Sequence, residues 1–466
     1  MPTSENTHPA AKTLFDRIWD AHRIADTAGG ASLVAIDRIF LHERTGASAL
    51  KSMAASGRRV RDPARTFAVM DHIVDTRPGR GDSTLMAGGQ GFITETRAAA
   101  IEAGITLFDV TDRDQGITHV ISPELGIALP GLTLVAPDSH TCTQGALGAL
   151  AWGIGSSEAE HAMVTGTLRL DRPRTMRVAF TGALPRGVTA KDMALALIAR
   201  YGAGGGAGHV VEFAGEAVRA LGIEGRMTLC NMATEFSAMT GIVAPDETTF
   251  RYLAGRRYAP DDFDDPYWHA LHSDDDARFD REIAIDAASL APMVTWGTSP
   301  EHAVAIDGAV PQGPARAHDY IGLPAGTPIA GTPVDAAFLG SCTNARLSDL
   351  QRAAAILRGR RISPAIRKAL VVPGSSAVRR AAEAEGLDQV FRDAGFEWRE
   401  SGCSLCFYAG GEGFAPGSRT ISSTNRNFEG RQGPGIRTHI ASPETVAASA
   451  LAGAIADPRR WMGDAA

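Results

Sequence analysis

Short apolar runs alternate with glycine-containing turns and alanine-rich stretches, and this alternation constrains the fold of the chain most. Apolar runs at 132–136, 336–339 and 369–372 each enter a polar turn, and the last two lead into helix-like segments near Arg346 and Ala377. Strands that alternate with helices in this way predict α/β layers with largely parallel sheets. Ligands bind at the carboxyl ends of strands in such sheets, so we expect functional residues in these turns.

The chain is long enough for several domains. Its 466 residues suffice for two to four domains of ordinary size. We expect an α/β domain over residues 1–174 and a second over 175–299. A stretch rich in Pro, Gly and Ala at 300–333 is interpreted as a linker, and a third α/β domain follows over 334–466.

Charge and cysteine content exclude some classes of function. A net charge of -7 argues against a general nucleic-acid binder, which needs a basic face. No apolar run approaches the length of a membrane span, and the segment up to Arg23 lacks the apolar core of a secretory signal. Five cysteines without such a signal are typical of a reducing cytoplasm. We therefore expect a cytoplasmic protein without a membrane or nucleic-acid partner.

Three of the cysteines form a pattern that suggests a metal centre. Cys403 and Cys406 lie three positions apart, and Cys342 follows a predicted strand 61 positions before Cys403. A cubane iron–sulfur cluster usually has four thiolate ligands, so three would leave one iron open as a Lewis acid. The spacing alone also allows a redox dithiol, a structural zinc site or a chance pair. Three glycines between 410 and 413 disfavour the helix that a redox dithiol needs, and zinc would need a fourth ligand, for which only distant His439 is a candidate.

Short motifs of polar and glycine residues recur along nearly the whole chain. They lie at 70–72, 116–119, 138–141, 145–148, 206–212, 230–235, 340–344, 402–406 and 423–431, and one of them, G-A-L-G at 145–148, leads into an apparent helix. Each motif alone is modest, but together and in this order they are specific. With them the chain resembles the aconitase family, in particular its two-subunit bacterial branch that acts on isopropylmalate.

This resemblance implies an architecture and a reaction. It implies three α/β/α domains with mainly parallel sheets around one [4Fe–4S] cluster, held by Cys342, Cys403 and Cys406. Because the chain ends 35 residues after Arg431, we expect it to lack the family's swivel domain and to form a heterodimer or larger assembly with a small subunit. The implied reaction isomerises 2-isopropylmalate and 3-isopropylmalate by dehydration and rehydration in leucine biosynthesis.

The resemblance also implies roles for acid–histidine pairs. His72, oriented by Asp71, is the candidate that protonates the leaving hydroxyl, since histidine titrates near neutral pH. Alone, an Asp-His pair is more often a polar turn. Ser139 lacks the G-x-S-x-G context of a hydrolase nucleophile. The remaining catalytic candidates are His119, Asp138, His140 and Glu235.

Two arginines suit a dicarboxylic substrate, because a guanidinium group binds a carboxylate with two hydrogen bonds. By resemblance Arg426 and Arg431 are substrate-binding residues, and Asn425 and Ser139 join them. Without the other motifs, this arginine-containing turn would be an ordinary solvated loop.

The chain departs from the family pattern after Cys406. Relatives carry an aliphatic residue followed by Met and Asn, whereas this chain has F-Y-A-G at 407–410. These residues adjoin a cluster ligand, so a paralogous hydro-lyase that acts on a related 2-hydroxy diacid such as citramalate stays open. Cys142 is a second departure, and we expect it to be sensitive to oxidation. A cluster-sensing RNA-binding regulator is disfavoured by the acidic charge, and a thiol–disulfide oxidoreductase by the glycines after Cys406.

Overall fold

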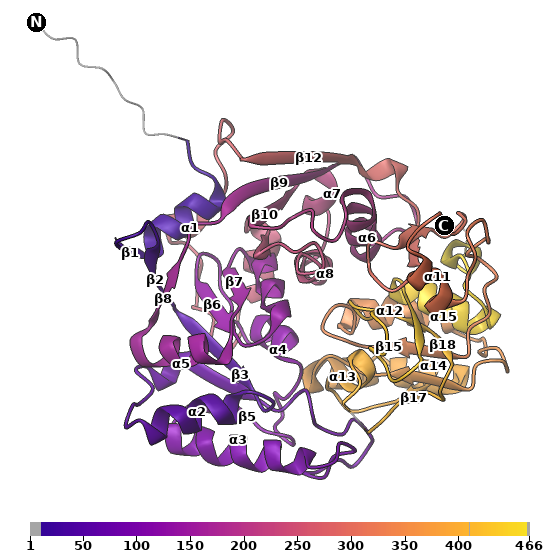
Figure 1. Cartoon of the computed structure of the whole chain (residues 1–466), viewed down its shortest axis with the longest axis horizontal. Helices are drawn as coiled ribbons and strands as arrows, with labels where there is room; N and C mark the ends of the chain where they lie inside the picture. The colour runs from indigo at the N-terminus through magenta and orange to yellow at the C-terminus, as the bar shows by residue number, and fades with distance from the viewer. Residues whose placement is uncertain (1–10, 410, 464–466) are drawn as a thin grey trace, which may run out of the picture.

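Three sheets of parallel strands follow one another along the chain (Figure 1). The computed structural model describes residues 11–409 and 411–463. Every neighbouring pair of strands within these three sheets is parallel, so the predicted α/β class with mainly parallel sheets is confirmed. No helix in the described part of the chain has the length and apolar character needed to cross a membrane.

The first sheet is buried on both faces. Its strands lie in the order β5 (Thr106–Phe108), β4 (Thr66–Val69), β3 (Arg38–His42), β6 (Thr133–Ala136) and β7 (Leu150–Gly153). Helices α2 (Gly46–Ala55), α3 (Gly89–Ala103) and α5 (Ser156–Thr165) lie beside it (Figure 1). Leu41 packs with Leu50 of α2 on one face. On the other face the rings of Phe40 and Phe67 stack with centroids 5.6 Å apart, as expected for side chains that alternate along a strand.

The second sheet follows in the order β11 (Thr240–Ile242), β10 (His209–Ala214), β9 (Arg174–Thr181) and β12 (Arg281–Asp286). Helices α6 (Ala190–Tyr201) and α8 (Ile223–Asn231) belong to this part of the chain. A long 3₁₀ segment, η2 (Ser139–Leu147), packs against α8 and β11. The prediction that the motif at 145–148 leads into a helix is wrong. Gly148 takes φ +79° and ends η2, and the chain continues into β7.

The third sheet has the order β17 (Glu397–Trp398), β16 (Lys368–Val371), β15 (Ala336–Leu339), β18 (Arg419–Ser422) and β19 (Arg437–Ile440). Its helices are α12 (Leu347–Leu357), α13 (Ser376–Ala384), α14 (Leu387–Ala394) and α15 (Pro443–Ala452). The strands predicted at 336–339 and 369–372 and the helices predicted near Arg346 and Ala377 are confirmed within one residue.

Residues 300–333, interpreted as a linker, carry regular structure. Strand β14 (Ala303–Ala305) pairs with β13 (Met293–Thr295), and helix α11 (Ala315–Ile321) follows. Ile306 and Val310 are buried in the core of the third sheet. The division into domains stays a proposal. The other α-helices and strands of the described residues are α1 (Leu14–His22), β1 (Arg23–Asp26), β2 (Ser32–Ala35), α4 (Thr118–Glu124), β8 (Thr167–Leu170), α7 (Glu216–Arg219), α9 (Glu247–Leu253) and α10 (Pro266–His269).

Candidate active site between the sheets

Three cysteines line a cavity of about 380 Å³. Cys342 follows strand β15, and Cys403 and Cys406 lie in the loop after β17. Each of the three is at most 6 % exposed. Ser341 (φ +78°) and Ser404 (φ +46°) hold left-handed backbone next to these cysteines. Such strained residues cluster at functional sites, which is consistent with loops shaped to present the three sulfurs.

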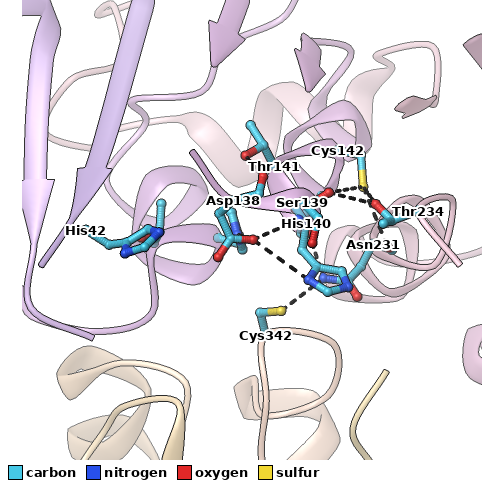
Figure 2. Close-up of polar contacts among 12 residues, drawn as sticks. His42, Asp138, Ser139, His140, Thr141, Cys142, Asn231, Thr234 and Cys342 are labelled. Carbon is cyan, nitrogen blue, oxygen red and sulfur yellow. Dashed lines mark hydrogen bonds and ion pairs between the residues drawn. The ribbon is translucent and has the colours of Figure 1, made fainter. Parts of the chain in front are cut away.

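Hydrogen-bond donors from other parts of the chain point at these sulfurs. Asn231 at the end of α8 places Nδ2 3.2 Å from Sγ of Cys342 (Figure 2). Asn425 Nδ2 lies 3.5 Å from the same sulfur, and Arg431 Nη2 lies 3.5 Å from Sγ of Cys406. Amide and guanidinium donors favour a sulfur in its charged form, and donors of this kind surround metal-bound thiolates.

The protein alone does not favour thiolates here. Burial, with the neighbouring Cys406, raises the pKa of Cys342 to about 12, and burial also raises that of Cys403 well above its usual range. A bound metal centre deprotonates its cysteine ligands, which resolves the conflict between these raised pKa values and the donors aimed at the sulfurs. Among the described residues, no further cysteine lines this cavity. The donor set therefore fits a cluster held by three thiolates.

A first acid–histidine network lies in the same cavity. His72 Nδ1 is 2.5 Å from Asp71 Oδ1, and its Nε2 is 3.1 Å from Asp138 Oδ2. Asp138 Oδ1 is also 2.9 Å from Nε2 of His119. Burial disfavours a charged His72, but Asp71 and Asp138 outweigh burial and hold its pKa well above the ordinary value. Burial likewise opposes ionisation of Asp138, yet His119 and His72 keep its pKa well below the usual range. His72 therefore lies between two carboxylates that favour its protonated form.

A second network joins the first sheet to residues from later in the chain. Glu235 Oε1 is 2.9 Å from His140 Nε2 and accepts a hydrogen bond from Arg426 Nε at 2.8 Å. His140 in turn donates its backbone N–H to Asp138 Oδ1 at 2.8 Å (Figure 2). Burial lowers the pKa of His140 against the opposing charge of Glu235, while His140 and Arg426 overcome burial to lower the pKa of Glu235. This environment therefore favours the neutral imidazole of His140 beside the ionised carboxylate of Glu235.

The structure brings together all the site residues expected from the sequence. Asp71 and Glu235 lie behind the cavity wall, in contact with His72 and with His140, and Asn425 contacts Cys342. Their roles belong to the proposal below. The others line the cavity itself: His72, His119, Asp138, Ser139, His140, Cys342, Cys403, Cys406, Arg426 and Arg431.

Sequence reasoning missed His42, which ends strand β3, and Glu43 and Arg44, which directly follow it. The ring of His42 stacks on His72 with centroids 4.1 Å apart, and burial together with His72 lowers the pKa of His42 to about 4. Glu43 accepts a hydrogen bond from the backbone N–H of Asp71 at 3.1 Å. These residues lack a recognisable motif, but the rule that ligands bind at carboxyl ends of parallel strands points to them.

Of the two departures from the family pattern, Phe407 lies in the cavity wall and Cys142 is buried outside the cavity. Phe407 lines the cavity, with its ring centroid 5.7 Å from that of His72. Gly410 lies outside the described residues. Cys142 is fully buried with Sγ 3.0 Å from Thr234 Oγ1, and burial raises its pKa to about 12 (Figure 2). A buried thiol of this kind is inert, which argues against the oxidation sensitivity expected from the sequence.

Two named relatives and one solved structure are similar to this chain. A protein from Bradyrhizobium diazoefficiens named 3-isopropylmalate dehydratase large subunit 1 is 51% identical over 463 residues, 96% of each chain. A protein from Roseiflexus castenholzii named 3-isopropylmalate dehydratase large subunit is 48% identical over 477 aligned positions, which cover 97% of this chain and 100% of that one. The crystal structure of holo aconitase X from Thermococcus kodakaraensis aligns with a TM-score of 0.46 and 15% identity, covering 85% of this chain and 84% of that chain.

The sequence profile of the family described as Aconitase family (aconitate hydratase) matches residues 16–453. This match covers most of the chain, and both named relatives extend over nearly all of it. The chain therefore belongs to the aconitase family.

Proposed function

We propose that this chain is the large subunit of a hydro-lyase that interconverts 2-isopropylmalate and 3-isopropylmalate in leucine biosynthesis. Two relatives at about half identity over nearly the full length are named for this activity. The observation that carries the proposal is one cavity in which Cys342, Cys403 and Cys406 face the carboxylate-flanked His72. An isomerisation through loss and return of water needs both an electrophile for the hydroxyl oxygen and a proton donor, and this cavity offers residues for both tasks.

Cys342, Cys403 and Cys406 are the proposed ligands of one [4Fe–4S] cluster. When bound, the cluster supplies an iron without a protein thiolate, which is a Lewis acid for the substrate hydroxyl. Asn231, Asn425 and Arg431 stabilise the charge on the sulfurs through the contacts described above.

His72 is the proposed general acid. Asp71 fixes the orientation of its ring through Nδ1, and Nε2 faces Asp138 and the cavity. In dehydration the C–O bond of the substrate breaks, and the leaving oxygen takes a proton from Nε2 to become water. A proton also leaves the adjacent carbon. In the reverse steps, the hydroxyl group adds to this adjacent carbon, and a proton adds to the carbon that first carried the hydroxyl group. His140, kept neutral by burial and oriented by Glu235, accepts or returns protons of the water.

Arg426 and Arg431 are the proposed ligands of the substrate carboxylates, supported by Asn425 and Ser139. Both guanidinium groups line the cavity, and Arg426 is held in place by Glu235 at 2.8 Å. A guanidinium group anchored in this way loses little side-chain entropy when a carboxylate binds.

A separate small subunit is the proposed partner, in a heterodimer or a larger assembly. Both relatives carry the words large subunit in their names. By resemblance to aconitases, the small subunit supplies the base that removes the carbon-bound proton. The chain alone is then expected to bind a cluster without turning substrate over.

A related 2-hydroxy diacid, such as citramalate, is the second candidate substrate. Phe407 favours it, because this aromatic side chain occupies the cavity wall beside His72, where it takes space from a branched alkyl group.

The test is to express the chain with and without its small subunit, reconstitute both anaerobically, and assay 2-isopropylmalate, citramalate and other 2-hydroxy diacids. The proposal predicts turnover of 2-isopropylmalate by the pair and none by the chain alone. Preference for citramalate would select the second candidate. A cluster-loaded pair that converts no hydroxy diacid would refute the proposed function.

A further inference from the structure

Arg44 stands in the cavity without a charged partner. It lies in the loop between β3 and α2, it is exposed, and its side chain lines the same cavity as the three cysteines. Within residues 11–409 and 411–463, no carboxylate lies within ion-pair distance of its guanidinium group. The two other cavity arginines are engaged: Arg426 pairs with Glu235 at 2.8 Å, and Arg431 donates to Cys406 Sγ at 3.5 Å. Arg44 is thus the cavity arginine most available to an anion.

Phe407 holds this guanidinium group in position. The guanidinium carbon of Arg44 lies 5.4 Å from the centroid of the Phe407 ring, and that of Arg431 lies 5.7 Å from the same centroid. Contacts at these distances are attractive because a cation meets the negative face of an aromatic ring. The ring itself cannot accept the N–H groups in the way a carboxylate does, so the hydrogen-bonding capacity of Arg44 stays available. Phe407 therefore links two guanidinium groups on one wall of the cavity.

We propose that Arg44 binds a carboxylate of the substrate and that Phe407 positions it, which makes this pair a determinant of substrate specificity. This inference rests on the proposed function, in which the substrate is a 2-hydroxy diacid. The substrate class that fits is an acid with one carboxylate at the Arg426–Arg431 side and a second within reach of Arg44. An uncharged alkyl group placed against Arg44 would desolvate a guanidinium group without compensation, which is unfavourable.

Binding of a simple diacid tests the inference separately from turnover. Malate and its two monoamides are titrated calorimetrically into the cluster-loaded chain, with and without the small subunit, for wild type, Arg44→Gln, Arg44→Lys and Phe407→Leu. Arg251→Gln is the matched control, because Arg251 is an exposed arginine on α9 outside the cavity. Loss of one charge-assisted contact is expected to raise the Kd of malate about tenfold to hundredfold in Arg44→Gln.

The other two variants and the two monoamides give further expected results. Arg44→Lys keeps part of the affinity, and Phe407→Leu loses less than Arg44→Gln. One monoamide binds wild type as weakly as malate binds Arg44→Gln. Arg44→Gln does not weaken the binding of that monoamide further, because the monoamide already lacks the carboxylate that contacts Arg44. The other monoamide stays sensitive to Arg44→Gln.

Other results would overturn the inference. The inference is wrong if malate binds Arg44→Gln as tightly as it binds wild type. It is also wrong if Arg44→Gln weakens the binding of malate and of both monoamides equally, because an equal loss indicates an indirect structural effect. Weakened association with the small subunit at unchanged malate binding would assign Arg44 to the subunit interface. Failure of the proposed function has a different signature, since the wild-type pair would then turn over none of the hydroxy diacids while the binding comparison still stands.

Discussion

Nε2 of His72 lies 3.1 Å from Oδ2 of Asp138, although the two residues follow different strands and are 66 positions apart in the sequence. His72 follows β4 and Asp138 follows β6, and β3 separates these strands in the first sheet. The parallel direction of the strands is what brings both side chains to one edge. The same carboxylate lies 2.9 Å from His119, so Asp138 joins two imidazoles in the cavity.

Replacement of Asp138 by Asn is expected to reduce kcat much more than it changes KM. The amide oxygen can still cap the backbone N–H of His140, but one of the two negative charges that raise the pKa of His72 is lost, and only that of Asp71 is left. Weakened general acid catalysis predicts a fall in kcat of about 10²–10⁴-fold. Steady-state kinetics of the cluster-loaded pair measure this effect. If iron content falls in proportion to kcat, Asp138 serves to retain the cluster, and its assignment to proton transfer is wrong.

The five cysteines are expected to separate into two groups. Serine at Cys342, Cys403 or Cys406 should abolish most cluster binding, because each supplies one thiolate. Serine at Cys142 or Cys230 should leave it intact, because both are buried outside the cavity and their thiols have raised pKa values. Iron and acid-labile sulfide per chain are measured after anaerobic reconstitution, with about four of each expected for wild type. Equal loss in Cys142→Ser would mean that the ligand set is misassigned.

Much of this architecture is accessible from the sequence because its signals are local. A polar turn separates the strand at 336–339 from the helix after Arg346, and its residues differ in composition from both elements. Each of the two elements forms where the sequence predicts it. Asp71 and Asp138 converge because both follow parallel strands of the first sheet. Cys342 follows a strand of the third sheet, so this rule predicts its place at a strand end but does not by itself bring it to the two carboxylates.

What sequence reasoning missed depends on contacts between distant segments. The motif at 145–148 predicts a helix after it, but Gly145 packs against the backbone of Gly241 in the second sheet, and Gly148 turns the chain toward β7. The Pro- and Gly-rich stretch at 300–333 resembles a linker, yet long-range packing buries Ile306. Arg44 carries no motif at all, and only its place after β3 brings it into the cavity.

Substitution of Gly145 by Ala is expected to affect both stability and activity. A Cβ at this position would lie 1.8 Å from the carbonyl oxygen of Gly241, so η2 must move away from β11. Overpacking of this kind costs about 1–3 kcal/mol. Because η2 also carries Ser139 and His140, kcat should fall as well. Chemical unfolding and kinetics measure the two effects. Gly204→Ala is the control, since a Cβ there meets no atom within 4 Å, and a loss in Gly145→Ala no larger than in this control would contradict the close contact.

The ion pair of His22 with Asp37 predicts a pH dependence of stability away from the active site. His22 Nε2 lies 2.7 Å from Asp37 Oδ2. Burial lowers the pKa of His22, but Asp37 and the carbonyl of Ile18 outweigh burial and raise it above the ordinary 6.5. This stabilisation is therefore fully present below about pH 6.5 while Asp37 is ionised, and it is lost as pH rises through the raised pKa of His22.

His22→Gln is accordingly expected to be less stable than wild type by about 1 kcal/mol near pH 6. The difference should shrink toward pH 9, and thermal unfolding across this range measures it. The same substitution made in an Asp37→Asn background is the control, since the partner charge is then absent. A difference that grows with pH, or that persists unchanged in this background, would show that the ion pair is not its source.

In the proposed function, Cys342, Cys403 and Cys406 hold a cluster in which one iron is left for the substrate. Mössbauer spectroscopy of the chain, reconstituted with isotopically labelled iron and assembled with its small subunit, tests this directly. On addition of substrate, about one quarter of the iron signal is expected to shift while the rest stays unchanged. A spectrum in which no iron responds to substrate, under conditions where the pair turns that substrate over, would contradict the claim.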